Sequence, residues 1–300
     1  MSGRKCPVVV GVGEVLWDML PDGKKMGGAP ANFAYHARAF GADSYAISCV
    51  GDDPLGQELL DRFNQLGLSQ RYVAVDRHHP TGTVDVHLDA DGKPYFVIHE
   101  EVAWDYLPPI PLFHEVIDGA DAVCFGSLAQ RSPVSRATIG ALLGAVPDHC
   151  CCIFDVNLRQ RFYSRDVIFC GLKAADVLKL NDDELPVIAE LLKLPGQDDE
   201  ARMSALLAEF DLELLVLTRG SHGSVLLSPT GRSEHAGFPA EVADTVGAGD
   251  AFTATVAMGL LRGLELDAIN EHANRVASFV CGQSGATPQL PDELTAPLRR

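Results

Sequence analysis

From about residue 120 onward, short apolar runs alternate with longer amphipathic stretches, and no other feature of the sequence restricts the fold as strongly. The apolar runs have the length of strands and fall near 121–126, 150–156, 176–180 and 213–218. Stretches with helical periodicity lie between them, near 133–145, 165–173, 182–193 and 200–209. Strands that alternate with helices predict βαβ units, which wind into a mostly parallel sheet with helices on both faces. Two more helices, expected at 249–262 and 267–281, close the fold.

The first third of the chain contains two kinds of strand pattern. The run at 8–12 is continuously apolar, as in a strand buried on both faces, and a second strand is expected at 46–50. By contrast, 81–88 alternates between apolar and polar residues, and a turn at 89–92 leads into 94–99. This pattern predicts a hairpin in a small sheet separate from the main one. Helices are expected between the strands, at 31–40 and 54–66.

The charge balance disfavours two classes of partner. There are 24 Lys and Arg residues against 41 Asp and Glu, which gives a net charge of −17. Such a surface repels the phosphate backbone of nucleic acids and anionic membranes, although a local cradle of amides can still bind a nucleotide. No apolar run approaches the ~20 residues of a transmembrane helix, and the N-terminal residues do not form a signal-peptide core. We therefore expect a cytoplasmic protein.

The eight cysteines include three in a row at 150–152, and most of them lie in or beside apolar runs. No two cysteines have the CxxC spacing. We therefore expect buried, reduced thiols and neither a disulfide framework nor a metal site.

The string Asp-Thr-Val-Gly-Ala-Gly-Asp-Ala-Phe at 244–252 leads into an apolar stretch with the pattern of a helix. The amides of Gly247, Ala248 and Gly249 would lie at the helix start, where N–H groups lack partners and the macrodipole is positive. Without bulky side chains there, a phosphate can reach these amides. Asp250 would follow in the first turn, ionised and with a pKa that is not raised, where it can deprotonate an alcohol beside a transferring phosphoryl group. A tight turn with an ordinary helix-start acid is the alternative.

That string resembles the second signature of the ribokinase-like (PfkB) family of carbohydrate kinases. A second motif, Gly-Gly-Ala-Pro-Ala-Asn-Phe-Ala at 27–34, is similar to the family's first signature in its fructokinase-like form. The motifs follow the family's order and spacing, and the resemblance covers almost the whole chain. It implies an α/β fold, a ribokinase-like three-layer sandwich with a mostly parallel central sheet and a small β-sheet lid. The whole of 1–300 would form one domain, with the lid contributed by about 13–26 and 81–105.

The resemblance also implies a sugar site at the ends of several strands. Asp18 matches an aspartate that accepts hydrogen bonds from a sugar diol, and Asn32 can donate to hydroxyls and accept from them. Arg159 lies in a segment similar to the family's Asp-Pro-Asn-x-Arg and can pair with a substrate or phosphate oxygen. Without the resemblance, Asp18 would be a solvated turn acid and Asn32 a helix cap. The full set is Asp18, Gly27, Gly28, Asn32, Gln130, Arg159 and Asp250.

A nucleotide site is implied by further matches. Its residues are Asn181, Thr218, Gly220, Gly223, Gly247, Gly249 and Asn274. Glu184 belongs to a segment similar to the family's Asn-x-x-Glu motif, which is associated with the water shell of Mg²⁺; ordinary helix capping is the alternative. The resemblance also makes K⁺ a candidate ion, held by the Asp244 side chain and the Val246 carbonyl.

Together these features predict a kinase that transfers the γ-phosphoryl group of ATP to a primary hydroxyl, with Mg²⁺ as cofactor. D-Fructose is the expected acceptor, because ribokinases tend to have a lysine where Ala29 stands. 2-Keto-3-deoxygluconate, ribose or a nucleoside are alternative acceptors, and a non-catalytic sensor on the same fold is a third class. Such sensors tend to lose the base or the glycines that are present here. By analogy with the family, a homodimer through the lid is expected.

Overall fold

The computed structural model describes residues 6–20, 23–88 and 94–299. The strands of its main sheet are β1 (Val8–Val12), β4 (Asp43–Gly51), β5 (Val73–Asp76), β8 (Ala122–Phe125), β9 (Cys151–Asp155), β10 (Val177–Asn181), β11 (Leu214–Thr218), β12 (Ser224–Leu227) and β13 (Arg232–His235). In space they follow the order β13-β12-β11-β10-β9-β8-β1-β4-β5. Neighbours from β11 to β5 are parallel, whereas β12 and β13 are antiparallel. The predicted mostly parallel sheet is confirmed.

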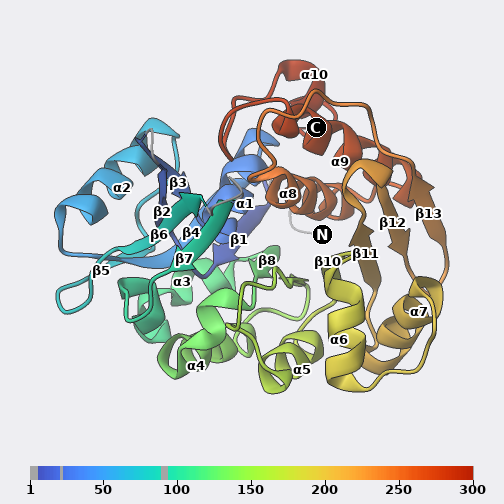
Figure 1. Cartoon of the computed structure of the whole chain (residues 1–300), viewed down its shortest axis with the longest axis horizontal. Helices are drawn as coiled ribbons and strands as arrows, with labels where there is room; N and C mark the ends of the chain where they lie inside the picture. Colours follow the sequence, from blue (N-terminus) through green and yellow to red (C-terminus); the bar gives the residue numbers. More distant parts are fainter. Residues whose placement is uncertain (1–5, 21–22, 89–93, 300) are drawn as a thin grey trace.

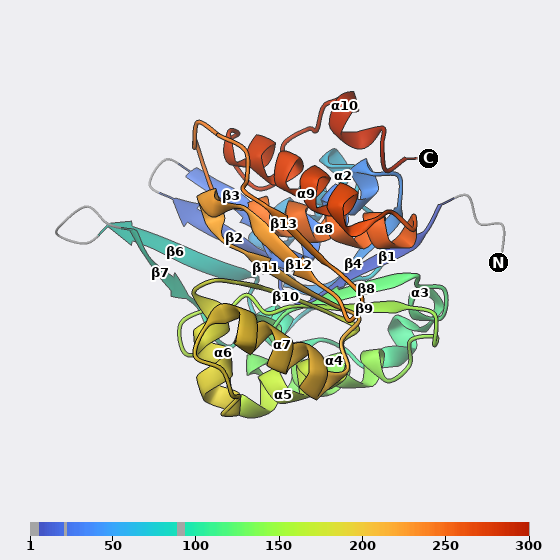
Figure 2. The ribbon, with the colours of Figure 1, turned by 90° about the vertical axis from the view of Figure 1, so that its right-hand side faces the viewer.

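Helices cover both faces of this sheet, so the molecule has three layers (Figures 1 and 2). One layer contains α3 (His114–Asp118), α4 (Pro133–Leu143), α5 (Arg165–Lys173), α6 (Glu184–Leu192) and α7 (Asp199–Phe210). The other contains α1 (Ala29–Ala39), α2 (Pro54–Gln65), α8 (Ala248–Leu261), α9 (Leu266–Cys281) and α10 (Asp292–Thr295). The first layer packs on one face of the sheet in a single cluster of core residues, whereas the second divides between a cluster on the other face and a smaller one that α2 and part of α1 share with the small sheet.

A second, smaller sheet projects from one end of the sandwich (Figure 2). Its strands are β2 (Leu16–Leu20), β3 (Gly23–Gly27), β6 (Gly82–Leu88) and β7 (Pro94–Ile98), in the order β3-β2-β6-β7. The antiparallel pairing of β6 with β7 confirms the predicted hairpin. The turn expected at 89–92 lies outside the described residues. Helix α2 covers one face of the small sheet, where Leu59 and Phe63 pack near Trp17 and Met26.

Helix α8 is largely buried in the core. Its side chains are small or apolar over almost the whole length, and ten of its residues are buried. It needs this composition because it lies between the main sheet, α1 and α9 and has almost no solvent-facing side. The core therefore fixes the position of its first turn.

Some elements were not predicted. They are short or irregular: β5, α3 and α10 have four or five residues each. All eight cysteines are free, but the expectation that they are buried is wrong for Cys6 and Cys170, which are exposed. Within the described part of the chain, none of the helices combines the length and apolar character that a bilayer crossing requires.

Candidate functional site

The candidate residues lie along one edge of the main sheet, in an order set by the strands. Thr218 and Asn181 are register partners at the ends of β11 and β10. Asp155 ends β9, Gln130 lies in the short helix after β8, and Glu14 follows β1. Because the carboxyl ends of parallel strands meet at one edge, residues from five strands come together there, as is typical of ligand sites in open α/β sheets.

Helix α8 begins above this edge with the glycine-rich string. Gly247 is its N-cap residue, with φ of 81°. A Cβ at this position would lie 2.5 Å from the Cα of Ala286, so neither the backbone angle nor the space permits a larger residue. The first-turn amides that follow have no intrahelical partners, although Ala248 N makes a long 3.4 Å hydrogen bond to the Thr245 carbonyl. The geometry of the helix start is compatible with an anion cradle, and the role of these amides stays a prediction.

Asp250 lies in the first turn of α8, and Asn32 contacts it directly. The Asn32 Nδ2 group donates a 2.8 Å hydrogen bond to Oδ2 of Asp250. The two sequence motifs, far apart in the chain, therefore meet at one carboxylate. Burial, and then the nearby Asp155 carboxylate, raises the pKa of Asp250 to about 6. The expectation of an unraised pKa was wrong, because desolvation outweighs both the helix terminus and the hydrogen bond from Asn32.

Two more acids accompany Asp250 on the same side of the site. Burial raises the pKa of Glu14 to about 7 and that of Asp18 to about 6. Arg159 is close enough to lower the pKa of all three carboxyls, and Lys25 acts similarly on Asp18. Asp18 lies in the middle of β2, in register with Lys25 on β3, and is not part of a turn. Burial outweighs these nearby cations in raising the pKa of all three acids, and such a cluster of acceptors suits a neutral ligand rich in hydroxyl groups.

Some polar atoms of this cluster are buried without a partner. Among the described residues, Oε2 of Glu14 and Oδ1 of Asn32 have no hydrogen-bond partner. The glycine pair is packed against the same region: a Cβ on Gly28 would lie 2.4 Å from the Glu14 carbonyl oxygen, and one on Gly27 would lie 2.5 Å from Oδ2 of Asp18. Gln130 is buried and donates to the Gly126 carbonyl. Buried acceptors without donors are costly, and hydroxyl groups would satisfy them.

An ion pair beneath the cradle was not predicted. Lys179 Nζ donates to Oδ1 of Asp155 at 2.9 Å, and the Thr253 hydroxyl donates to Oδ2 at 2.7 Å. Burial acts to lower the pKa of Lys179, but Asp155 and Glu184 raise it overall. A Cβ on Gly249 would lie 3.2 Å from Lys179 Nζ, which places the ammonium directly under the first turn of α8. One lysine within an otherwise apolar strand was the signal that could have revealed it.

Asn181 and Glu184 form reciprocal hydrogen bonds between side chain and backbone at the start of α6. Asn181 Oδ1 accepts from the Glu184 amide at 2.8 Å, and Glu184 Oε2 accepts from the Asn181 amide at 2.9 Å. Oε1 of Glu184 accepts from the Leu158 amide at 2.7 Å. A carboxylate has about four lone-pair positions, so Glu184 retains the capacity to bind water. This geometry fits an Mg²⁺ ion that keeps its own waters.

The other nucleotide candidates are farther along the sheet edge. Gly220 is in open space, whereas Gly223 is packed against the His235 carbonyl, where a Cβ would lie at 1.9 Å. Asn274 is buried, and its Nδ2 donates to Ser224 Oγ at 2.7 Å, which ties α9 to β12. The nucleotide roles of these residues and of Thr218 stay predictions.

Comparison with known proteins agrees with this architecture. The model of the "pfkB family carbohydrate kinase" family matches residues 22–293, so the chain belongs to this family of carbohydrate kinases. A fructokinase of Klebsiella pneumoniae is 34% identical over 89% of this chain and 87% of that protein. An uncharacterized sugar kinase of Pyrococcus horikoshii is 29% identical over 96% of this chain and 94% of its own length. Its crystal structure has a TM-score of 0.82 and 27% identity, and covers 96% of this chain and 97% of that one.

A more distant structure shares the fold. It is a doubly mutated Vibrio cholerae fructokinase with bound fructose, ADP and a potassium ion, with a TM-score of 0.78 and 24% identity over 99% of this chain and 100% of that one. The predicted ribokinase-like fold is therefore confirmed.

Proposed function

We propose that this protein is an ATP-dependent fructokinase that forms fructose 6-phosphate. The observation that carries the proposal is a pair of buried acceptors without donors: Oε2 of Glu14 and Oδ1 of Asn32 lie beside Asp250 and the start of α8. A neutral polyol supplies the hydroxyl donors that these oxygens lack, and one of its hydroxyls would lie between Asp250 and the cradle. The fructokinase of Klebsiella pneumoniae, at 34% identity, supports fructose as that polyol.

In the proposed reaction, the hydroxyl oxygen at C6 forms a bond to the γ-phosphorus of ATP. The bond from that phosphorus to the β–γ bridging oxygen breaks, and ADP leaves with the electron pair. The hydroxyl proton passes to Asp250, which Asn32 holds in position. The amides of Gly247, Ala248 and Gly249 stabilise the charge on the transferring group. With a pKa of about 6, Asp250 is mostly ionised at pH 7 and can return the proton to solvent afterwards.

The nucleotide occupies the other half of the edge, near the ends of β10 and β11 and the start of α8. Glu184 and Asn181 would hold the water shell of an Mg²⁺ ion, which would offset phosphate charge when bound with ATP. The candidates Thr218, Gly220, Gly223 and Asn274 line this half. The small sheet is a lid of the single domain: it covers the sugar and excludes water, which would otherwise accept the phosphoryl group.

The test is ADP release with ATP and Mg²⁺ and a panel of acceptors: fructose, ribose, glucose, 2-keto-3-deoxygluconate and adenosine. We expect a clear preference for fructose. The three acids around Arg159 disfavour the acidic 2-keto-3-deoxygluconate, so a preference for that acceptor would contradict the assignment of the sugar. ATP binding without turnover on any acceptor would instead favour a sensor.

We also propose that two copies pair through their lids. The exposed side chains Phe96 and Val97 on β7, an edge strand of the small sheet, support this arrangement. Light scattering on a size-exclusion column checks it: Phe96→Glu should convert a dimer to a monomer.

A further inference from the structure

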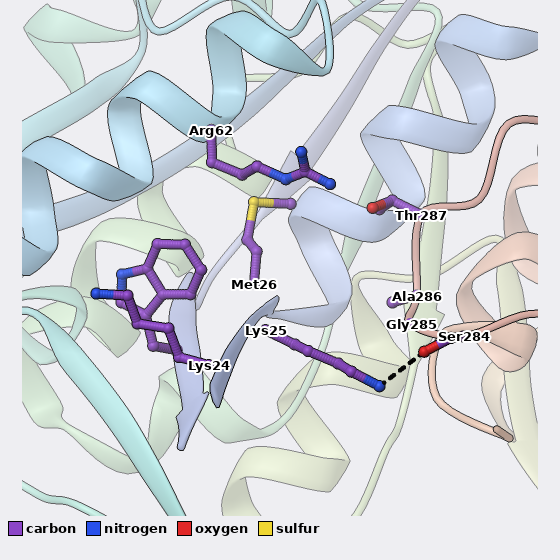
Figure 3. A pocket seen from close by; sticks show the side chains of 9 residues that line it. Lys24, Lys25, Met26, Arg62, Ser284, Gly285, Ala286 and Thr287 are labelled. Atoms are coloured by element: carbon purple, nitrogen blue, oxygen red, sulfur yellow. Dashed lines mark hydrogen bonds between the residues drawn. The ribbon is translucent and has the colours of Figure 1, made fainter. Parts of the chain in front are cut away.

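Lys25 on the small sheet reaches across to the loops that hold the start of α8. Its Nζ group lies 3.0 Å from the Ser284 hydroxyl and 3.3 Å from Oδ2 of Asp244. Figure 3 shows this side chain extending toward Ser284, while Lys24 extends in another direction. The contact joins residues more than 200 positions apart in the chain, and it links the sugar side of the site to the nucleotide side.

The Asp244 side chain connects the loop that precedes α8 to the loop that follows α9. Its Oδ1 accepts from the Val246 amide at 3.1 Å, and its Oδ2 accepts from the Gly285 amide at 3.1 Å. Burial acts to raise the pKa of Asp244, but these amides and Lys25 lower it overall. Gly247 packs directly on Ala286 in the loop after α9. The positions of the amides at the start of α8 therefore depend on the hydrogen bonds of Asp244.

The resemblance to the family assigns a monovalent cation to Asp244 and the Val246 carbonyl. The residues of this chain do not fit that assignment well. Oδ2 of Asp244 already faces the ammonium group of Lys25 at 3.3 Å, and Oδ1 accepts from the Val246 amide. A K⁺ ion on Oδ2 would lie close to this positive charge, and like charges at short distance repel strongly when partly shielded from water.

We infer that the Lys25 ammonium takes the place of the monovalent cation, so that ordering of the cradle does not require K⁺. As a consequence, Lys25 on β3, a strand of the proposed sugar side, supplies the positive charge that orders the loops of the proposed nucleotide side. This inference rests on the proposed function only where activity is measured. Lys25 acts as a positioning residue, because it contacts Asp244 and Ser284.

The competing interpretation is an ordinary surface ion pair, since the Lys25 side chain is 40% exposed. Such pairs contribute little and their loss would not create a need for one particular ion. Lys24 provides a matched control, because it is the adjacent lysine on β3 and pairs instead with Glu58.

The experiment compares the wild-type protein with Lys25→Met, Lys25→Arg and Lys24→Met. Thermal unfolding with bound Mg·ADP is measured in KCl, NaCl and choline chloride at equal ionic strength, and KM for ATP is measured in the same salts. The wild type, Lys25→Arg and Lys24→Met should behave alike in K⁺ and choline. Lys25→Met should melt lower in choline, with KM for ATP raised roughly tenfold, and K⁺ should restore both.

Stabilisation of the wild type by K⁺ relative to choline would overturn the inference. So would indifference of Lys25→Met to K⁺, or a K⁺ response of Lys24→Met equal to that of Lys25→Met. The melting comparison needs no acceptor sugar. If no sugar is phosphorylated but the melting pattern is as expected, the fructokinase proposal fails and the role of Lys25 stands.

Discussion

The two halves of the site differ in how their polar groups are satisfied. On the proposed sugar side, Glu14, Asp18 and Asp250 have raised pKa values, and buried oxygens lack donors. On the proposed nucleotide side, Asp155 is paired with Lys179. Asn181 and Glu184 are hydrogen-bonded to each other there.

This difference indicates what each half contributes. The nucleotide side is held by internal bonds that also stabilise the fold, so it is formed before any ligand binds. The sugar side keeps carboxylates in an environment that disfavours their charge, which costs stability but leaves acceptors and a base ready for the substrate. Substitutions on the two sides should therefore change stability in opposite directions.

The largest effect on activity is expected from Asp250→Asn. Loss of the base should lower kcat by about 10³-fold or more, while affinity for ATP changes little because the cradle is intact. The unliganded protein should become more stable, by about 1–2 kcal/mol, since a partly desolvated charge is removed. Steady-state kinetics, calorimetric titration with a non-hydrolysable ATP analogue and urea unfolding measure the three quantities. Near-normal turnover would end the proposed mechanism.

Gly247→Ala should damage the cradle by sterics alone. The added Cβ would collide with Ala286, so kcat should fall about 10²-fold and stability by about 1–3 kcal/mol. Gly263→Ala, at the other end of α8, is the matched control: its φ is 67° and a Cβ there has open space. That variant should lose about 1 kcal/mol and keep its kinetics. Equal kinetic losses in both variants would mean that general strain in α8, and not the cradle, is responsible.

Lys179→Met tests the proposed nucleotide side, where buried polar groups are paired with one another. It leaves the Asp155 carboxylate buried without its cation and should cost about 3–5 kcal/mol in the free energy of unfolding. Adding Asp155→Asn should recover part of this loss, because the uncompensated charge is then removed. The free energies of unfolding of both single variants and the double variant in urea give the coupling energy. A coupling energy near zero would show that the pair is not the element that holds this half together.

The sequence was sufficient for the features that depend on local pattern. The main sheet, the long helices and the glycine-rich start of α8 follow from periodicity and from the residues that turns require. The four residues of β5 are too few to show a period. The partners of Asp155 and Asp250 could not be inferred from pattern, because Thr253 is 98 positions from Asp155 and Asn32 is 218 positions from Asp250. The raised pKa of Asp250 depends on burial by those distant segments.

The smallest effect, and the most direct test of the contrast, is the pH dependence of stability. The three acids of the sugar side bind protons more tightly in the folded state, with pKa values of about 6, 6 and 7, than in the unfolded chain. Their contribution therefore favours folding at low pH and is lost as pH rises from about 4.5 to about 7. Buried His36, whose pKa is lowered to about 4, acts in the opposite direction, so the contribution of the acids is measured as a difference: the urea midpoint at pH 5.5 relative to pH 8 should be higher in the unliganded wild type than in Glu14→Gln.

Glu14→Gln isolates one group of the three. The Glu14 carboxylate is buried, so replacing it with a neutral amide should raise the free energy of unfolding by about 1–3 kcal/mol at pH 8. The free energy of unfolding should then also depend less on pH. The loss of an acceptor should raise KM for the sugar about tenfold while KM for ATP changes little. Glu234→Gln is the control, since Glu234 is paired with Arg219 and Arg232 at the surface. A decrease in stability for Glu14→Gln at pH 8 would show that the sugar side is as well satisfied as the nucleotide side.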